Sequence, residues 1–212
     1  NCSADVVSST VPCSNKWMIG TVNSFFIGFV ATFIATTLGT LAALGLSRPH
    51  MPYKGLIMAI LISPMIVPLI ITAAGMFFFY ARINLVYSFT GIILAHVALA
   101  TPFVVITVTA TLVGFDMNMV KASQSLGARP VRTFFKVIMP LILPGVISGA
   151  LFAFITSFDE VVIVMFMASL DQLTIPNQMW AGIRQEISPV ILCMATCLVV
   201  LSILLLTTVE LL

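Results

Sequence analysis

The chain has 212 residues, of which 60% are hydrophobic and only 8% are charged, and its mean hydropathy is +1.19. Ordinary soluble domains carry about 25% charged residues, so this composition excludes a water-soluble globule that must cover itself with polar groups. Nine basic and seven acidic residues give a formal net charge of +2, which favours neither nucleic acid nor an acidic partner. We therefore expect an integral membrane protein.

A polar leader, residues 1 to 17, opens the chain and contains Cys2 and Cys13. Two cysteines are a weak signal, so a disulfide in an oxidising compartment and two free thiols both remain open. Cys193 and Cys197 lie one helical turn apart in an apolar run, and we expect them to be small packing residues. Because the chain does not begin with Met and stops within an apolar stretch, we expect further residues beyond both ends.

Five apolar stretches are long enough to cross a bilayer, which takes about 20 helical residues. They cover residues 18 to 46, 56 to 80, 87 to 114, 141 to 167 and 190 to 212. The predicted fold is an all-α, polytopic transmembrane helical bundle that makes up residues 18 to 212.

The basic residues predict the orientation, because short loops rich in Lys and Arg stay in the cytoplasm. With the leader outside, the cytoplasmic loops carry Arg48, Lys54, Lys121, Arg129, Arg132 and Lys136. The external side then carries Lys16, Arg82 and Arg184. Six basic residues on the cytoplasmic side against three on the external side favour an external leader and a cytoplasmic segment at residues 115 to 140.

Three prolines interrupt the predicted spans, namely Pro64, Pro68 and Pro102. Proline removes a backbone donor that lipid cannot replace, so each needs a neighbouring helix or a wet cavity. Packing kinks and a gating hinge both remain open.

The cytoplasmic segment, residues 115 to 140, predicts two short helices joined by a tight turn. Asp116 can cap the first helix, and Gly127 stands where a left-handed residue would end it. Pro130 suits the first position of the second helix. An i, i+3, i+4, i+7 pattern then places Val131, Phe134, Phe135 and Ile138 on one stripe. This stripe is either a docking face for a protein or the apolar side of a segment lying at lipid headgroups.

The segment "KASQSLGARPVRTFFKVIMPLILPG" resembles the EAA loop of binding-protein-dependent ABC transporter permeases. The positions that match the loop pattern are Ala122, Gly127, Val137 and Pro140. Three positions differ, with Lys121 for the usual Glu, Ser123 for the second Ala and Met139 for Leu. The spacing is intact.

The resemblance implies that this loop couples the permease to a cytoplasmic ATPase. The implied coupling residues are Lys121, Ala122, Ser123, Gly127, Ala128, Arg129, Phe134, Phe135 and Pro140. Lys121 reverses the charge of the usual Glu, so docking would rest on shape and apolar contact. A well-buried Phe contributes about 1.5–3 kcal/mol, against about 0–1 kcal/mol for one exposed ion pair.

Further blocks, such as "ISPMIVPLIITAAG" and "GALFAFITSFDEVVIVMF", resemble the second membrane subunit of polyamine importers. The resemblance covers nearly the whole chain and implies the six-span permease fold, with the first span upstream of residue 1. It also implies a second permease, an external substrate-binding protein and an inner-membrane location. The chain contains no "GxxxxGK[ST]" phosphate-binding loop, so we expect ATP and Mg²⁺ on a partner ATPase, with no cofactor or enzymatic activity here.

Asp159 and Glu160 lie in the apolar run "FITSFDEVVIVMF", where an ionised carboxylate needs water or a partner. The resemblance implies a substrate pathway for a small cation at this motif, formed by Ser157, Asp159 and Glu160. A structural ion pair or a helix end at the water interface is the alternative. Trp17 and Trp180 could form cation–π walls for an ammonium ligand or anchor the helices at the interface.

Two other classes compete with an ABC permease. A secondary transporter would couple an ion gradient through His96, Asp159 and Glu160, but this hypothesis leaves the basic segment unexplained. A membrane enzyme is disfavoured because the few titratable residues of the spans are scattered and form no nucleophile or metal cluster.

Overall fold

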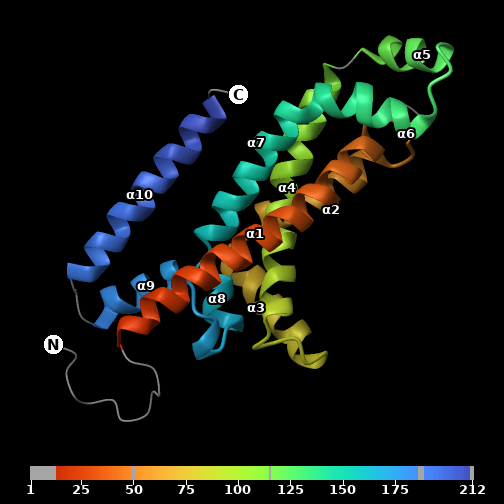
Figure 1. Ribbon diagram of the computed structural model, residues 1–212. Helices are drawn as coiled ribbons and strands as arrows, with labels where there is room; N and C mark the ends of the chain where they lie inside the picture. Colours follow the sequence, from red (N-terminus) through yellow and green to blue (C-terminus); the bar gives the residue numbers. More distant parts are fainter. Residues whose placement is uncertain (1–12, 49–50, 115, 186–188, 211–212) are drawn as a thin grey trace.

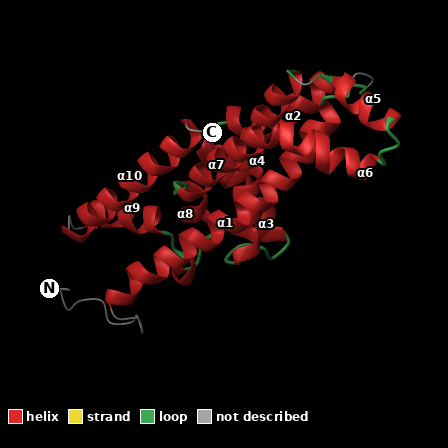
Figure 2. Ribbon diagram, turned by 45° about the horizontal axis from the view of Figure 1, so that its top comes forward, coloured by secondary structure: helices red, strands yellow, loops and turns green. Residues whose placement is uncertain are grey.

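The computed structural model describes residues 13–48, 51–114, 116–185 and 189–210. Within these ranges all regular elements are helical and none is a strand (Figure 2), which confirms the all-α prediction. In chain order the α-helices are α1 Cys13–Leu46, α2 Lys54–Ile66, α3 Leu69–Arg82, α4 Phe89–Val113, α5 Met117–Ser125, α6 Pro130–Thr133, α7 Met139–Phe158, α8 Val162–Met167, α9 Ile175–Gln185 and α10 Pro189–Glu210. A π-helical segment, Phe134–Ile138, joins α6 to α7, and a 3₁₀ turn, Leu170–Gln172, follows α8.

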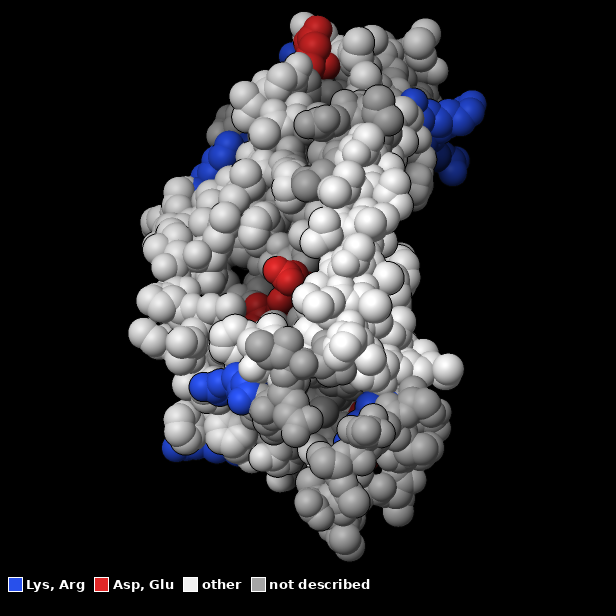
Figure 3. Space-filling model, turned by 90° about the vertical axis from the view of Figure 1, so that its left-hand side faces the viewer, with Lys and Arg blue, Asp and Glu red and all other residues white. Residues whose placement is uncertain are grey.

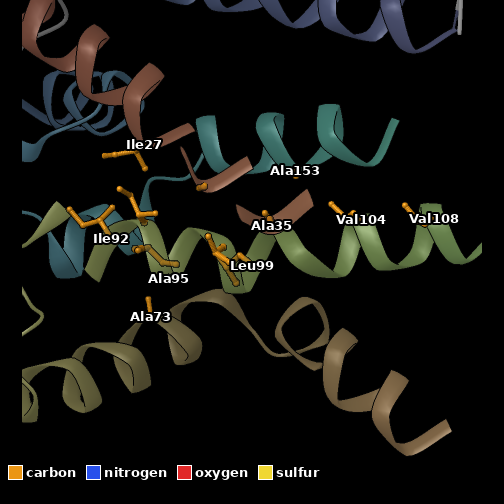
Figure 4. Packing of buried hydrophobic residues seen from close by; sticks show 14 of the residues in the cluster. Ile27, Ala35, Ala73, Ile92, Ala95, Leu99, Val104, Val108 and Ala153 are labelled. Carbon is orange, nitrogen blue, oxygen red and sulfur yellow. The ribbon is translucent and has the colours of Figure 1, made fainter. Parts of the chain in front are cut away.

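Helices α1, α4 and α7 pack against one another and form the centre of the bundle (Figure 1). Helix α4 is apolar around its whole circumference, which is typical of a helix surrounded by other helices. Its residues Ile92, Ala95, Val104 and Val108 are buried, and Ala153 of α7 faces the same cluster (Figure 4). The core therefore lies around α4.

Two glycines let α7 approach α4 closely. A Cβ on Gly149 would lie 2.5 Å from Thr107 Oγ1 and 3.1 Å from the Cα of Val104, and a Cβ on Gly145 would collide with Thr111 Oγ1. The spacing Gly145-x-x-x-Gly149 is the small-residue pattern by which membrane helices bring their backbones together. The contact between α4 and α7 depends on the absence of side chains at these two positions.

The predicted span over residues 56 to 80 is sharply bent at its second proline. Helix α2 ends at Ile66, α3 begins at Leu69, and the two are bent by 102°. Val67 precedes Pro68 and has φ −71° and ψ 135°, the extended conformation to which a residue before proline is biased. The pair is therefore a broken span or a re-entrant segment.

The predicted span over residues 141 to 167 also needs correction. Its helix is continuous from Pro130 to Phe158 and then stops, so that α8 is a separate short helix. Of the described helices, three are long and apolar enough to cross a membrane, at Lys16–Leu46, Phe89–Val113 and Pro130–Phe158, and the bent pair would add a fourth. Helix α10 contributes a shorter apolar stretch, Pro189–Leu205, and carries Cys193 and Cys197. Both cysteines are free and exposed, so the structure of this chain does not bear out the expectation that they are small packing residues.

The bundle has two ends of different character (Figure 1). The end of α1, the start of α2 and the α5–α6 segment lie at one end, whereas the start of α1, the end of α3, α8 and α9 lie at the other. The six basic residues assigned above to cytoplasmic loops belong to the first end, and the other three belong to the second. Residues 1 to 12 of the predicted leader lie outside the described residues. Its last five residues belong to α1, which begins at Cys13.

Candidate functional site

The most unusual local feature of the bundle is the break between α7 and α8. Helix α7 ends at Phe158, and the backbone N–H of Asp159 still donates to the carbonyl of Ile155 at 3.0 Å. Residues 159 to 161 are not helical, and the next helix begins at Val162. The acidic pair thus occupies a gap between two helices rather than the middle of one helix.

A cavity of about 410 Å³ opens at this break. It is lined by Asp159, Glu160 and neighbouring residues of α7 and α8, together with Leu69 at the start of α3. Figure 3 shows a hollow that contains acidic side chains, with uncharged atoms between it and the basic side chain below it. The Asp159 side chain is exposed, whereas Glu160 is only 7% exposed.

The charged groups near the cavity come from helix ends and from side chains. The C-terminal end of α7 contributes a partial negative charge, and the N-terminal ends of α3 and α8 contribute partial positive charges, so the helix ends together do not make the cavity negative. The carboxylates add full negative charges, and no Lys or Arg side chain lines the described cavity. The two carboxylates are therefore the charged side chains among the described lining residues of the cavity.

The two acidic residues have different surroundings. Glu160 Oε1 accepts a hydrogen bond of 3.0 Å from the backbone N–H of Ile163, in the first turn of α8. The Asp159 side chain has no hydrogen bond or ion pair among those found in the described parts of the chain. Glu160 is thus tied to the protein backbone, and Asp159 is open to the cavity.

Ser157 is held from the other side of the break. Its Oγ lies 2.8 Å from Nδ1 of His96, and both side chains are buried. The Nε2 atom of His96 has no partner among the described residues. The bond between Ser157 and His96 joins the last turn of α7 to the middle of α4, two residues before Asp159.

The tryptophans are not brought together with the acidic pair. Trp180 lines a second cavity of about 380 Å³ between α8 and α9, and the guanidinium of Arg184 lies 5.9 Å from the centre of its ring. Any ammonium ligand would compete with Arg184 for that ring. Trp17 is half-buried in the first turns of α1 and does not line either described cavity.

The predicted helix–turn–helix is present, and we name residues 116–138 the basic hairpin. Asp116 caps α5, because its carboxylate accepts the backbone N–H of Asn118 at 2.9 Å. Gly127 has φ +78° and ends the turn in the left-handed region, and Pro130 begins α6. Ser123 Oγ lies 3.0 Å from Thr133 Oγ1 and links the two helices. These local predictions are confirmed.

The apolar stripe predicted for the basic hairpin does not form a single face. Val131 and Phe135 are 69% and 63% exposed, whereas Ile138 packs partly against the bundle core and Phe134 is half-buried. The π-helical turn is wider than an α-turn, so the 3.6-residue period fails there. Lys121, Ala122, Arg129 and Pro140 are exposed, and Ser123 and Ala128 are half-buried.

Leu69 is a lining residue that the sequence alone did not single out. Pro68, one residue earlier, was the available signal, because a proline in a span requires a neighbouring helix or a cavity. The break at Pro68 does bring the start of α3 to the cavity beside Asp159.

Comparison with known protein families assigns residues 35–212 to the family described as "Binding-protein-dependent transport system inner membrane component". The chain belongs to this family. It is 32% identical, over 181 residues, to the spermidine/putrescine transport system permease protein PotC of Haemophilus influenzae. It is also 32% identical to PotC of Escherichia coli K12 over 174 residues, and 29% identical to the E. coli putrescine transport system permease protein PotI over 181 residues.

These alignments cover 85%, 82% and 82% of the chain, and 70%, 66% and 64% of the respective relatives. The chain thus spans about two thirds of the length of the curated relatives that it matches. Family membership disfavours both the secondary transporter and the membrane enzyme, because it makes the chain the membrane component of a binding-protein-dependent system.

Solved structures share the fold. The chain superposes on a chain of the inward-facing MetNI methionine ABC transporter with a TM-score of 0.73 and 19% identity, covering 95% of this chain and 96% of the other. It also resembles an amino acid ABC transporter, with a TM-score of 0.67, 18% identity, and coverage of 94% and 95%. These similarities establish an ABC importer permease fold.

Proposed function

We propose that the chain forms, together with a second permease, the membrane path for a small cationic solute of the polyamine class. The observation that carries the proposal is the open carboxylate of Asp159, which lies at a helix break in a cavity whose described lining contains no Lys or Arg. The relatives named for spermidine and putrescine transport support the same substrate class. Among the predicted pathway residues, Asp159 is the direct contact.

The basic hairpin is the proposed docking element for a cytoplasmic ATPase. It projects from one end of the bundle, and the helix that leads from it runs on to the break at Asp159 (Figure 1). Val131 and Phe135 are exposed large apolar residues at its surface, next to the basic residues. In this proposal the partner ATPase binds ATP and Mg²⁺, and movement of the hairpin reaches the cavity along α7.

The charge distribution supports the proposed orientation. Six basic residues at the hairpin end and three at the α9 end favour a cytoplasmic hairpin, because short basic loops are retained inside. An external substrate-binding protein would then deliver the solute at the end that carries α8 and α9.

Uptake by the assembled transporter tests the substrate proposal. The complex with its ATPase and second permease is reconstituted in vesicles, and ATP-dependent uptake of radiolabelled putrescine is measured with the binding protein outside. Asp159→Asn should raise the KM for uptake about tenfold or more. An ion pair at 4 Å gains about 4 kcal/mol at an effective dielectric constant of 20, desolvation of the two ions offsets much of this gain, and each remaining 1.4 kcal/mol or so is a tenfold change.

Asp171→Asn is the matched control, because Asp171 is an exposed acidic residue that does not line the cavity. It should leave the KM unchanged. Equal effects of the two variants, or no effect of either, would refute a cation contact at Asp159. Failure of an ATPase and a second permease to copurify with the chain would refute the proposed assembly.

A further inference from the structure

Glu160 is adjacent to Asp159 but is held in a different way. Only 7% of the residue is exposed, and its Oε1 accepts the backbone N–H of Ile163 at 3.0 Å. The first N–H groups of a helix have no partner within the helix, and a carboxylate is a good acceptor for them. Glu160 therefore satisfies one backbone N–H in the first turn of α8.

Helix α8 needs such an anchor because it is only six residues long. One face of it is buried in the bundle, with Ile163, Val164 and Met167 each at 0% exposure. The Glu160 bond fixes the start of this helix relative to the chain that leaves α7. This hydrogen bond therefore restrains the break from the α8 side.

The α7 side of the break is held independently. The N–H of Asp159 donates to the carbonyl of Ile155 at 3.0 Å, and His96 holds Ser157 at 2.8 Å. Asp159 lies between these two anchored sides, with its side chain exposed to the cavity. A ligand-binding group is effective when the residues around it hold it in place.

We propose that Glu160 is a positioning residue: it caps α8 and thereby holds Asp159 towards the cavity, and it does not itself bind the transported cation. The proposal rests on the function proposed above. It assigns different roles to two neighbouring acidic residues that the sequence presents as equivalent, and it leaves one cation-binding carboxylate in the described part of this chain's cavity.

Two substitutions at Glu160 separate capping from charge. Glu160→Gln removes the charge but keeps a carbonyl oxygen that can accept the N–H of Ile163, whereas Glu160→Ala removes both. Putrescine uptake by the reconstituted complex is measured for both variants, with Asp159→Asn as the reference for loss of the cation contact. KM and maximal rate are compared at matched amounts of assembled complex, because they separate binding of the ligand from later steps.

Glu160→Gln should keep its KM within about twofold of the wild type, while Glu160→Ala should lose about tenfold or more in the ratio of maximal rate to KM. A rise in KM for Glu160→Gln equal to that of Asp159→Asn would overturn the positioning role and make Glu160 a ligand, with the proposed function intact. Uptake by Glu160→Ala equal to the wild type would also overturn it.

The Asp159→Asn variant distinguishes failure of the proposed cation site from failure of the positioning role of Glu160. If Asp159→Asn itself leaves the KM unchanged, then the cation site of the proposed function is refuted, and with it the positioning role. If Glu160→Ala fails to assemble, Glu160→Gln still decides, because a ligand role and a capping role predict opposite results for that variant.

Discussion

The close contact between α4 and α7 makes a sharp prediction about Gly149. Gly149→Ala places a Cβ 2.5 Å from Thr107 Oγ1 and 3.1 Å from the Cα of Val104. The Thr107 hydroxyl is bonded to carbonyls of its own helix at 3.0 and 3.1 Å, so rotating it away breaks those bonds. The Val104 contact involves backbone and cannot be relieved by a change of rotamer. The two helices must therefore move apart.

The expected change in the free energy of unfolding of Gly149→Ala follows from two opposing effects. Replacing a helical glycine by alanine normally stabilises by about 0.5–1 kcal/mol, whereas overpacking a close contact costs about 1–3 kcal/mol. Gly75→Ala is the matched control, because Gly75 lies in α3 and a Cβ added there would meet nothing within 4 Å, so that this variant gains only the first effect.

The assay is thermal unfolding of the detergent-purified complex. A single domain of about this length shifts its melting temperature by about 2–4 °C for each kcal/mol, and the same direction is expected for this chain within the complex. Gly149→Ala should melt several degrees below Gly75→Ala, and adding Thr107→Ala should recover part of the loss, because one of the two contacts is removed. A Gly149→Ala variant that melts at or above the Gly75→Ala control would show that α4 and α7 are not closely packed.

Two further predictions concern the ends of the bundle. Gly127→Val should cost about 1–2 kcal/mol of backbone strain, because Gly127 has φ +78°, and should lower the substrate-stimulated ATPase activity of the complex. Gly114→Ala is the control and should leave this activity unchanged, because Gly114 has φ −81°. Equal stimulation in both variants would count against the coupling role. Asn23 is buried and donates to two carbonyls of the connection between α8 and α9, so Asn23→Ala should cost about 1–3 kcal/mol, while Thr37→Ala on an exposed face of α1 should change little. Melting temperatures of the purified complexes check the second pair, and indistinguishable values would contradict it.

Local rules correctly predicted the basic hairpin. Three of its features depend only on a few neighbouring residues, so the amino-acid sequence is enough to identify them. They are the helix cap at Asp116, the left-handed residue Gly127 and the helix start at Pro130. The prediction of a single apolar stripe through Val131 and Phe135 was wrong, because it assumed a constant helical period. The period changes at a π-helical turn, which nothing in the hydrophobic pattern indicates.

The two prolines of the second predicted span show where local rules stop. Pro64 and Pro68 both follow an apolar stretch, and the bias against α-helix in the preceding residue applies to each. Helix α2 nevertheless continues through Pro64, while the chain breaks by 102° at Pro68. The sequence presents the two positions as similar, and the local rule does not distinguish the proline that breaks the helix from the one that does not.

The amino-acid sequence by itself determined that the chain is an all-helical membrane protein, which loops are basic, and that two acidic residues lie in an apolar run. These properties depend on composition and short-range order along the chain. Only the tertiary structure decided that the acidic pair occupies a helix break, that Asp159 faces a cavity and that Glu160 faces a backbone N–H. The physical reason is that burial and hydrogen-bond partners come from residues far apart in sequence, such as Leu69 beside Asp159 and His96 beside Ser157, and no local pattern specifies those encounters.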